Sequence, residues 1–417
     1  MAELGNPAGE PPQHISPFIG REDELAKLAS LFANQRIVNL PGPPGRGKSC
    51  LALEFAHRYR GRFPDGVTWV DLGNSTGYSG IAEAIAAALQ LSQVRDQLVL
   101  QTVTGALREQ QMLLVVDDCT ESADDCEAVF SYLLEHCKHL KILATSVCHL
   151  GSNDWCNWVV PPLALNMEEP TGDDDAVRLF ATSAEGAGTP LLLDQETVCQ
   201  VRDICAQVGC EPQYIKWAAG RLAVYTPEEI AEQLRMWAEG HGGESPSGTL
   251  ADEQHIGHWL KHLLGLAPQE RDLLARLAIF PGSFTRASAE AVCTDDGMRA
   301  DVHWLIPPLH RRSLIDVEPG DGVRRYRIHP VLRKHCLRGI LTEVDLEELR
   351  AQRLRWLELL AERAGTGLRG PDQAKILAEV QREYGTLQAA LRELTPVDAD
   401  RGLQVIVALW RFWEVRG

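Results

Sequence analysis

The chain has 417 residues, of which 45% are hydrophobic and 24% charged, a composition typical of folded globular proteins and not of disordered or fibrous ones. At roughly 100–200 residues per domain, this length predicts about three domains. The net charge of −17 repels polyanions over the chain as a whole, so nucleic-acid binding requires a local basic patch. With no signal-peptide pattern and no run of 18 apolar residues, we predict a cytoplasmic protein without a membrane span.

Eleven cysteines are scattered between Cys50 and Cys336 without a C-x-x-C pair. Many lie within or beside apolar runs, as Cys119 does directly after MLLVVDD. A zinc site usually shows close-spaced ligand pairs. We therefore interpret the cysteines as reduced core residues rather than metal ligands.

The first 17 residues are rich in proline and glycine and are predicted to form a flexible lead-in (residues 1–17). They are followed by Phe-Ile-Gly-Arg-Glu at positions 18–22 and by a predicted short helix over 24–34. We do not expect an effector domain in this lead-in.

From residue 36 to about residue 161, short apolar runs alternate with helical patterns. The runs are RIVNL, GVTWVDL, MLLVVDD, KILATS and NWVV. Continuous apolar strands separated by helices are typical of a parallel sheet covered on both faces. We assign residues 18–165 to one α/β domain.

The next segment shows only helical patterns, for example in DAVRLFATSAEG and QETVCQVRDICAQVG. We expect a small helical domain over residues 166–239. The stretch EGHGGESPSG that follows has the composition of a linker, and we place the linker over residues 240–253.

Beyond the linker, helical patterns around 255–266, 269–280 and 286–292 precede two strand-like runs that flank a Pro-Gly-Asp-Gly turn. Three helices followed by a hairpin is the order of a winged helix, which we predict over residues 254–340. Residues 341–417 are helical again and end in ALWRFWEVRG. An apolar helix at this position needs a neighbour, and we expect this helical segment to be the first piece of an array of helical repeats.

The strongest motif is Gly-Pro-Pro-Gly-Arg-Gly-Lys-Ser at positions 42–49, which matches the P-loop pattern G-x-x-x-x-G-K-S/T between a strand and a helix. Its glycines let main-chain N–H groups surround the β-phosphate, Lys48 neutralises the β/γ oxygens, and Ser49 offers a hydroxyl to Mg²⁺ at a helix N-terminus that favours anions. The alternative is an ordinary glycine-rich turn. The motif predicts binding of ADP or ATP with Mg²⁺ by Gly42, Pro44, Gly45, Arg46, Gly47, Lys48, Ser49 and Cys50.

Two adjacent carboxylates follow the strand MLLVV. Asp117 is placed to hold Mg²⁺ through water, and Asp118 to polarise an attacking water, which with Lys48 makes slow ATP hydrolysis the expected chemistry. The alternative is a pair of acidic residues that opens a loop. Thr145 and Ser146 end the next strand, at the edge where ligands bind in open α/β sheets, and either sense the γ-phosphate or cap the strand.

Taken in order, these motifs resemble the NB-ARC branch of the STAND signal-transduction ATPases, in the bacterial regulators that continue into tetratricopeptide-like repeats. The resemblance runs from residue 18 to residue 417. Its marks are Phe18 to Glu22, the P-loop, Asp117-Asp118, Thr145-Ser146, Gly209 to Pro212 and Ile328 to Pro330.

The resemblance implies how a nucleotide is held. Residues matching Ile19, Gly20 and Arg21 line the adenine, Pro212 packs on the base from a helical lid, and His329 of the winged helix contacts the β-phosphate of ADP. The ADP form is then a closed sandwich of three domains. The ATP form opens and self-associates in response to a protein or ligand signal that the sequence does not identify.

Three features depart from the family pattern. Val147 stands where the family commonly has an arginine that reaches the γ-phosphate, which predicts weaker ATP sensing. Glu211 and Gln213 lie in a lid motif that is usually apolar around its proline. Pro330 stands where an acidic residue is common.

Three functions fit these residues. The first is an ADP/ATP switch, and the second is a motor or phosphotransferase with rapid substrate-stimulated turnover. The third is a transcription regulator whose winged helix binds DNA through Arg311 and Arg312 and a nearby basic patch around His329. The alternative is that this patch is an ordinary solvated surface. Because the total charge is acidic and the winged helix usually serves this family as a packing module, we do not expect DNA binding through this chain.

Overall fold

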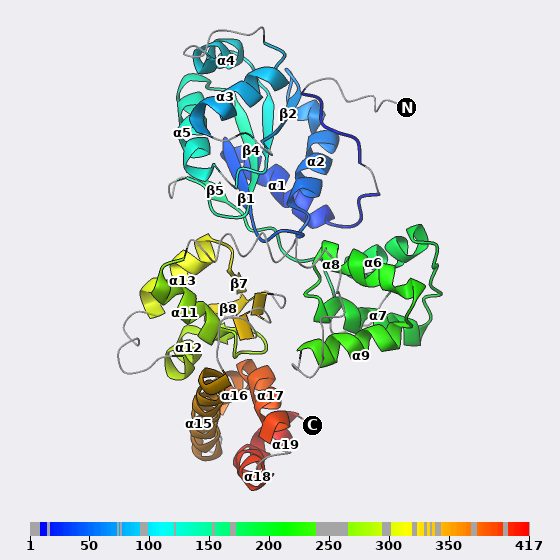
Figure 1. The fold of residues 1–417 in the computed structure, drawn as a ribbon, viewed down its shortest axis with the longest axis vertical. Coiled ribbons are helices and arrows are strands. Elements are labelled where there is room, and N and C mark those ends of the chain that lie inside the picture. Colours follow the sequence, from blue (N-terminus) through cyan, green and yellow to red (C-terminus); the bar gives the residue numbers. More distant parts are fainter. Residues whose placement is uncertain are drawn as a thin grey trace. The chain divides into compact units, whose positions relative to one another are not determined.

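The computed structural model forms two compact units, Met1–Pro246 and Ser247–Gly417, and each is considered by itself (Figure 1). The structure describes residues 9–14, 17–72, 75, 77–91, 99–120, 122–151, 155–166, 172–238, 266–293, 302–318, 323–328, 332–333, 336–337, 343–367, 373–394 and 399–416. The predicted linker at 240–253 lies outside these residues.

A five-stranded parallel sheet forms the centre of the first unit, with strand order β2-β3-β4-β1-β5. The predicted parallel sheet is confirmed. The predicted fifth strand is too long, because β5 has two residues and Pro161 and Pro162, which have no N–H to donate, follow soon after. The strands are β1 (Ile37–Pro41), β2 (Val67–Asp71), β3 (Leu113–Asp117), β4 (Lys141–Ser146) and β5 (Cys156–Asn157).

Helices cover both faces of this sheet (Figure 1). Side chains alternate between the faces along a strand, so Leu113 and Val115 of β3 join the core with α1 and α2, while Leu114 and Val116 join the core with α3, α4 and α5. This two-sided burial explains the unbroken apolar run of β3. The covering helices are α1 (Glu22–Asn34), α2 (Lys48–Arg58), α3 (Gly77–Ala88), α4 (Val99–Leu107) and α5 (Ala123–His136), with the 3-10 turn η1 (Arg60–Arg62) after α2.

The predicted flexible lead-in is wrong for residues 9–14, which pack on the α/β unit. The Gly9 carbonyl accepts a hydrogen bond from Trp69 N at 2.9 Å on the edge strand β2. His14 Nε2 lies 2.8 Å from Glu54 Oε2 on α2. Pairing a chain segment with an edge strand satisfies main-chain groups that would otherwise stay open. Residues 1–8 and 15–16 lie outside the described residues.

Four helices follow the sheet and pack mainly against one another, as the sequence predicts. The α7 helix begins where the Asp194 carboxylate accepts a hydrogen bond from Thr197 N at 2.8 Å. Pro212 is the first residue of α8, a position where its missing N–H costs nothing. The helices are α6 (Asp175–Gly186), α7 (Gln195–Gln207), α8 (Pro212–Gly220) and α9 (Pro227–Ala238), with the 3-10 turn η2 (Arg221–Ala223) after α8.

The second unit begins with helices around a three-stranded antiparallel sheet in the order β6-β8-β7. Sequence reasoning missed the strand β6 and the helix α13. The helix α13 contains Pro307 and Pro308, which are unfavourable inside a helix, yet Val302, Ile306 and Leu309 form its buried face. The elements are α11 (Pro268–Leu277), β6 (Phe284–Thr285), α12 (Arg286–Val292), α13 (Val302–Arg311), β7 (Ile315–Glu318) and β8 (Arg325–Ile328).

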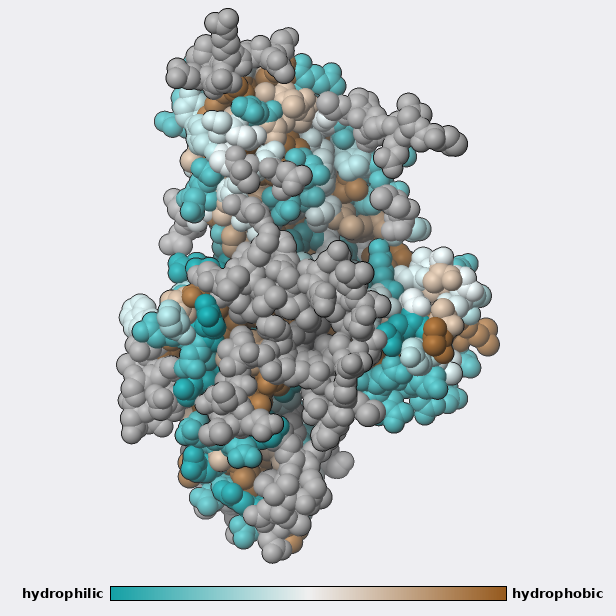
Figure 2. Space-filling view, viewed as in Figure 1, coloured by the Kyte–Doolittle hydropathy of each residue, from teal (hydrophilic) through white to brown (hydrophobic). Residues whose placement is uncertain are grey.

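Helices complete the second unit. Phe412 is 2% exposed, and Trp413 packs on Tyr384 with ring centroids 5.6 Å apart. Two of the terminal aromatics therefore have neighbours within the unit. The third, Trp410, is 46% exposed. No described helix is long and apolar enough to cross a membrane. On the face in Figure 2, hydrophobic residues form small patches among hydrophilic ones. The helices are α15 (Glu343–Gly367), α16 (Gln373–Arg382), α17 (Tyr384–Leu394), α18 (Ala399–Ala408) and α19 (Trp410–Arg416).

The predicted core location of the cysteines is right for six of them and wrong for two. Cys50 and Cys199 are exposed, at helix positions that face away from the core. Burial raises the pKa of the Cys336 thiol to about 12, so this side chain stays protonated and unreactive. The buried cysteines are Cys119, Cys126, Cys137, Cys205, Cys293 and Cys336.

The second unit contains a buried carboxyl that is expected to make its stability depend on pH. Glu383 Oε1 lies 3.7 Å from Arg325 Nη1 of β8, and burial, partly opposed by Arg325, raises the pKa of Glu383 from 4.5 to about 7. The folded state therefore binds more protons than the unfolded state between these values, and stability falls as pH rises through them.

We expect the free energy of unfolding of the second unit, measured in the whole chain, to be about 1–2 kcal/mol lower at pH 7.5 than at pH 5.5. Glu383→Gln removes this difference, whereas Glu348→Gln on the exposed side of α15 keeps it. Denaturant unfolding of the three proteins at both pH values measures it. A Glu383→Gln protein with the full pH dependence would assign the titration to another group.

Candidate functional site

The P-loop segment lies between β1 and α2, where the sequence places it. Gly45 and Gly47 have φ angles of 87° and 82°, a left-handed conformation that glycine adopts without steric cost. Gly47 is the N-cap residue of α2, which begins at Lys48. The first N–H groups of a helix have no partner within the helix and point at an anion placed before it. The loop is therefore shaped to receive a phosphate.

The Lys48 ammonium lies inside this loop. Its Nζ donates hydrogen bonds to the carbonyls of Gly42 at 2.8 Å and Pro43 at 2.9 Å. Burial, and secondly the nearby Arg46 guanidinium, lowers the pKa of Lys48 from 10.5 to about 8. A bound anion would favour the charged ammonium and raise the pKa of Lys48 again.

Hydroxyl groups hold the first of the two aspartates. The Asp117 carboxylate accepts hydrogen bonds from Thr145 Oγ1 and from the Ser49 hydroxyl, and Thr145 Oγ1 accepts a hydrogen bond from Asp118 N at 3.0 Å. Burial raises the pKa of Asp117, and its two hydroxyl donors oppose this. Thr145 is thus engaged between the two aspartates. The exposed Asp118 has φ 60°, a conformation that aspartate tolerates better than most residues.

Two predicted metal ligands, Ser49 and Asp117, therefore meet in space. A hydroxyl beside a carboxylate fits Mg²⁺, which keeps several waters and completes its shell with phosphate oxygens rather than with a full set of protein ligands. Accordingly, the described residues hold no cluster of three or more histidine, cysteine or acidic side chains suited to a metal. The two residues after Thr145 are structural, since Ser146 Oγ at the end of β4 donates to Asn39 Oδ1 at 3.0 Å and Val147, directly after the strand, is buried.

The segment of helices α6 to α9, which we call the lid, reaches the P-loop through the start of α8. Arg46 Nη2 and Nε lie 2.6 Å and 2.9 Å from Glu211 Oε1, and the two side chains are 2% and 1% exposed. Gln213 N donates to the Gly45 carbonyl at 3.2 Å. A β-carbon at Gly47 would lie 3.5 Å from Pro212 Cγ. The unusual Glu211 of the lid motif is thus explained by a partner, Arg46, that sequence reasoning did not give it.

Arg21 makes a second contact between the lid and the α/β domain that carries the P-loop. Its main-chain N donates to Asp175 Oδ2 at 3.0 Å, and its Nη2 donates to the Arg46 carbonyl at 2.8 Å. Burial lowers the pKa of Arg21, and its Nη1 is a buried donor without a protein acceptor. Gly20 lies so close to the Asp175 carboxylate that a side chain there would clash.

The remaining predicted residues are placed less tightly. Ile19 is half-buried beside Gly20, and Cys50 is exposed in the first turn of α2. The Arg46 side chain faces Glu211, so its main-chain N–H is the group left to meet a phosphate. His329 and Pro330 lie outside the described residues.

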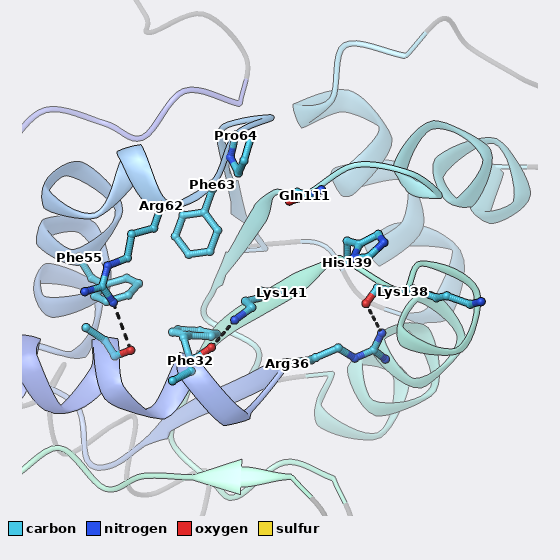
Figure 3. Close-up of a pocket in the computed structure, with 12 residues that line it drawn as sticks. Phe32, Arg36, Phe55, Arg62, Phe63, Pro64, Gln111, Lys138, His139 and Lys141 are labelled. Carbon is cyan, nitrogen blue, oxygen red and sulfur yellow. Dashed lines mark hydrogen bonds between the residues drawn. The ribbon is translucent and has the colours of Figure 1, made fainter.

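Another cleft, of about 470 Å³, lies at the opposite ends of the strands, where β1 and β4 begin (Figure 3). Three of its cations, Arg36, Arg62 and Lys141, donate to main-chain carbonyls. Arg36 Nη1 donates to the carbonyls of Cys137 at 3.1 Å and Lys138 at 3.0 Å after α5, and Lys141 Nζ donates to the Phe32 carbonyl near the end of α1. Cations at helix C-termini stabilise the fold. We therefore place the candidate site at the P-loop.

Comparison with known families agrees with this placement. Residues 21–180 match the NB-ARC domain family, and this stretch contains the P-loop, Asp117 and Thr145. This segment is an NB-ARC domain. The match ends within α6, the first lid helix.

The chain is similar to proteins of Mycobacterium and Streptomyces. Rv0894 of Mycobacterium tuberculosis is 29% identical over 85% of this chain and 90% of its own length. The putative HTH-type transcriptional regulator Rv0890c of the same organism is 28% identical over 87% of this chain and 40% of its own length. The regulatory protein AfsR of Streptomyces griseus is 24% identical over 80% of this chain and 35% of its own length.

Solved structures resemble the chain only distantly. The Walker-type ATPase PABY2304 of Pyrococcus abyssi aligns with a TM-score of 0.47 and 14% identity, over 76% of this chain and 96% of its own. The STAND protein PH0952 of Pyrococcus horikoshii, which has a tetratricopeptide repeat sensor, aligns with a TM-score of 0.32 and 15% identity, over 99% of this chain and 60% of its own.

Proposed function

We propose that this NB-ARC protein is a regulatory switch that is closed when it binds ADP, and that opens and self-associates when ATP replaces ADP. The observation that carries the proposal is the contact between the lid helix α8 and the P-loop at Gly45 and Arg46. A lid seated on a phosphate-binding loop couples nucleotide binding to domain arrangement. A difference in affinity of a few kcal/mol between the two arrangements is enough to shift the population.

The site residues have separate roles in this proposal. Main-chain N–H groups of the P-loop and Lys48 bind the phosphates, and Ser49 and Asp117 hold Mg²⁺, which neutralises phosphate charge when bound. Asp118 orients the attacking water for slow hydrolysis, which resets the switch. Arg21, with its unpartnered buried donor, binds the base or ribose beside Ile19 and Gly20. The lid supplies Pro212.

The second unit contributes a winged helix to the switch. The order α11, β6, α12, α13, β7, β8 and the sheet order β6-β8-β7 support this assignment for residues 254–340.

Nucleotide released by heat from the freshly purified protein, identified by chromatography, tests the proposal. We expect ADP at near one per chain, and none from Lys48→Ala. A protein that carries no nucleotide and binds added ADP only weakly would disprove the switch. Rapid ATP hydrolysis stimulated by a substrate would favour a motor or phosphotransferase instead.

DNA binding through the winged helix is the second candidate. One observation favours it: α13 carries His310 and Arg311 at its basic end and an exposed Trp304, and relatives include putative HTH-type transcriptional regulators. The chain's net charge of −17 opposes it. Salt-dependent binding to duplex DNA that is lost in Arg311→Gln/Arg312→Gln would establish this function, and no binding at low salt would exclude it.

A further inference from the structure

The pairing of Arg46 with Glu211 is unusual because both charges are removed from water. The two side chains come from a phosphate-binding loop and a lid helix that are 165 residues apart in sequence. Two hydrogen bonds, at 2.6 Å and 2.9 Å, join the guanidinium to Glu211 Oε1. Glu211 is also the N-cap residue of α8, where the helix dipole favours a negative charge.

A buried pair of this kind is stable only while its partners stay together. Separating them leaves each charge either buried alone, which is strongly unfavourable, or exposed to water, which requires the lid to move away. The ion pair can therefore form only while the lid lies on the P-loop.

Other polar contacts hold the lid beside this pair. The helices α6 to α9 pack mainly on one another, and polar contacts join them to the rest of the first unit. Among the described residues these polar contacts include, beside the Arg46–Glu211 pair, the main-chain bonds of Gln213 to Gly45 and of Leu163 to Cys210, at 3.2 Å and 3.0 Å, and the Arg21 N to Asp175 bond at 3.0 Å. Each lies at the start of a lid helix or in the segment that leads into the lid.

The same pair also fixes the shape of the loop. Arg46 directly precedes Gly47 and Lys48, its carbonyl accepts the Arg21 Nη2 bond, and its guanidinium reaches the Val160 carbonyl at 3.4 Å. A lid that leaves would release the part of the loop that surrounds a phosphate.

We propose that Arg46 and Glu211 are positioning residues that latch the lid onto the P-loop and thereby set how fast bound nucleotide leaves. This rests on the proposed nucleotide function. In the switch, a signal that opens the lid acts against this pair, and ADP is released once the pair is broken.

A double-mutant cycle on the whole chain tests the latch, with release of fluorescent N-methylanthraniloyl-ADP into excess ADP as the measurement. We expect Glu211→Gln and Arg46→Met each to speed release by at least about tenfold, since each removes one partner of a buried ion pair. In Arg46→Met/Glu211→Leu both members of the pair are replaced by apolar side chains, so release should be slower than the product of the single effects predicts.

The matched control is an exposed ion pair of the lid, Arg235 and Asp203, whose side chains are 57% and 46% exposed. Asp203→Asn should change release less than about twofold, because exposed pairs contribute little. Folded Glu211→Gln and Arg46→Met proteins that release nucleotide at the wild-type rate, or single effects that multiply in the double variant, would overturn the latch.

Hydrogen exchange of the nucleotide-free protein separates the latch from the proposed function. We expect amides of α8 to exchange at least about tenfold faster in Glu211→Gln than in the wild type, while those of β3 and β4 are unchanged. If the wild type binds no nucleotide but α8 loosens, the proposed function fails and the latch stands as a lid contact. Unchanged exchange in α8 refutes the latch itself.

Discussion

Replacing Lys48 with methionine is expected to weaken ADP binding by on the order of a hundredfold and to abolish a proton uptake that accompanies binding. The ammonium lies in the P-loop with a pKa lowered to about 8 by burial and by Arg46. Hydrogen bonds to charged groups contribute about 1.5–3 kcal/mol each, so losing the lysine's bonds to the phosphates accounts for the expected loss of affinity.

The proton uptake follows from the direction of the pKa shift. Near pH 8.5 most of the nucleotide-free protein carries a neutral Lys48, and a bound diphosphate favours the charged form and raises its pKa. Binding at this pH should therefore take up at least about half a proton, whereas binding near pH 6.5 should take up none at this residue. Calorimetry in two buffers of different ionisation enthalpy measures the uptake.

Lys27→Met, on the exposed side of α1, is the control and should keep both the affinity and the proton uptake. If Lys48→Met retained the uptake at pH 8.5, another group would be the one that titrates. If the wild type showed none, the lowered pKa of Lys48 would not be relieved by the ligand.

The sheet was predictable from the sequence because each of its central strands is buried on both faces. Such strands appear as unbroken apolar runs, and β3 and β4 match these runs almost to the residue. The P-loop and the meeting of Ser49 with Asp117 were also predictable, since the carboxyl ends of parallel strands and the following helix N-terminus share one edge of a sheet.

The lid contact was not predictable, because a buried ion pair between residues 165 apart leaves no local pattern. Two features of the sequence pointed toward it: an arginine inside the P-loop, and Glu211 in a motif that is usually apolar in the family that the sequence resembles. In the same way, α13 was hidden by its two prolines, and only the buried face of Val302, Ile306 and Leu309 reveals it.

Replacing Asp117 with asparagine is expected to remove the Mg²⁺ dependence of nucleotide binding and to slow ATP turnover by about a hundredfold or more. Asp117 accepts hydrogen bonds from Ser49 and Thr145, so its carboxylate is fixed at the edge of the P-loop. Asparagine fits the same space but carries no negative charge, so it holds the hydrated metal less well. Single-turnover hydrolysis and ADP binding, each measured with and without Mg²⁺, test this.

Asp118→Asn is the matched comparison, because the two aspartates are adjacent but differ in setting. Asp118 is exposed and its main-chain N–H bonds to Thr145, so its carboxylate is free to act on a water while Asp117 supports the metal. We expect Asp118→Asn to slow turnover yet keep the Mg²⁺ dependence of binding. If Asp117→Asn kept that dependence and Asp118→Asn lost it, the two roles would be exchanged. The metal would then be held by Asp118, and Asp117 would act on the water.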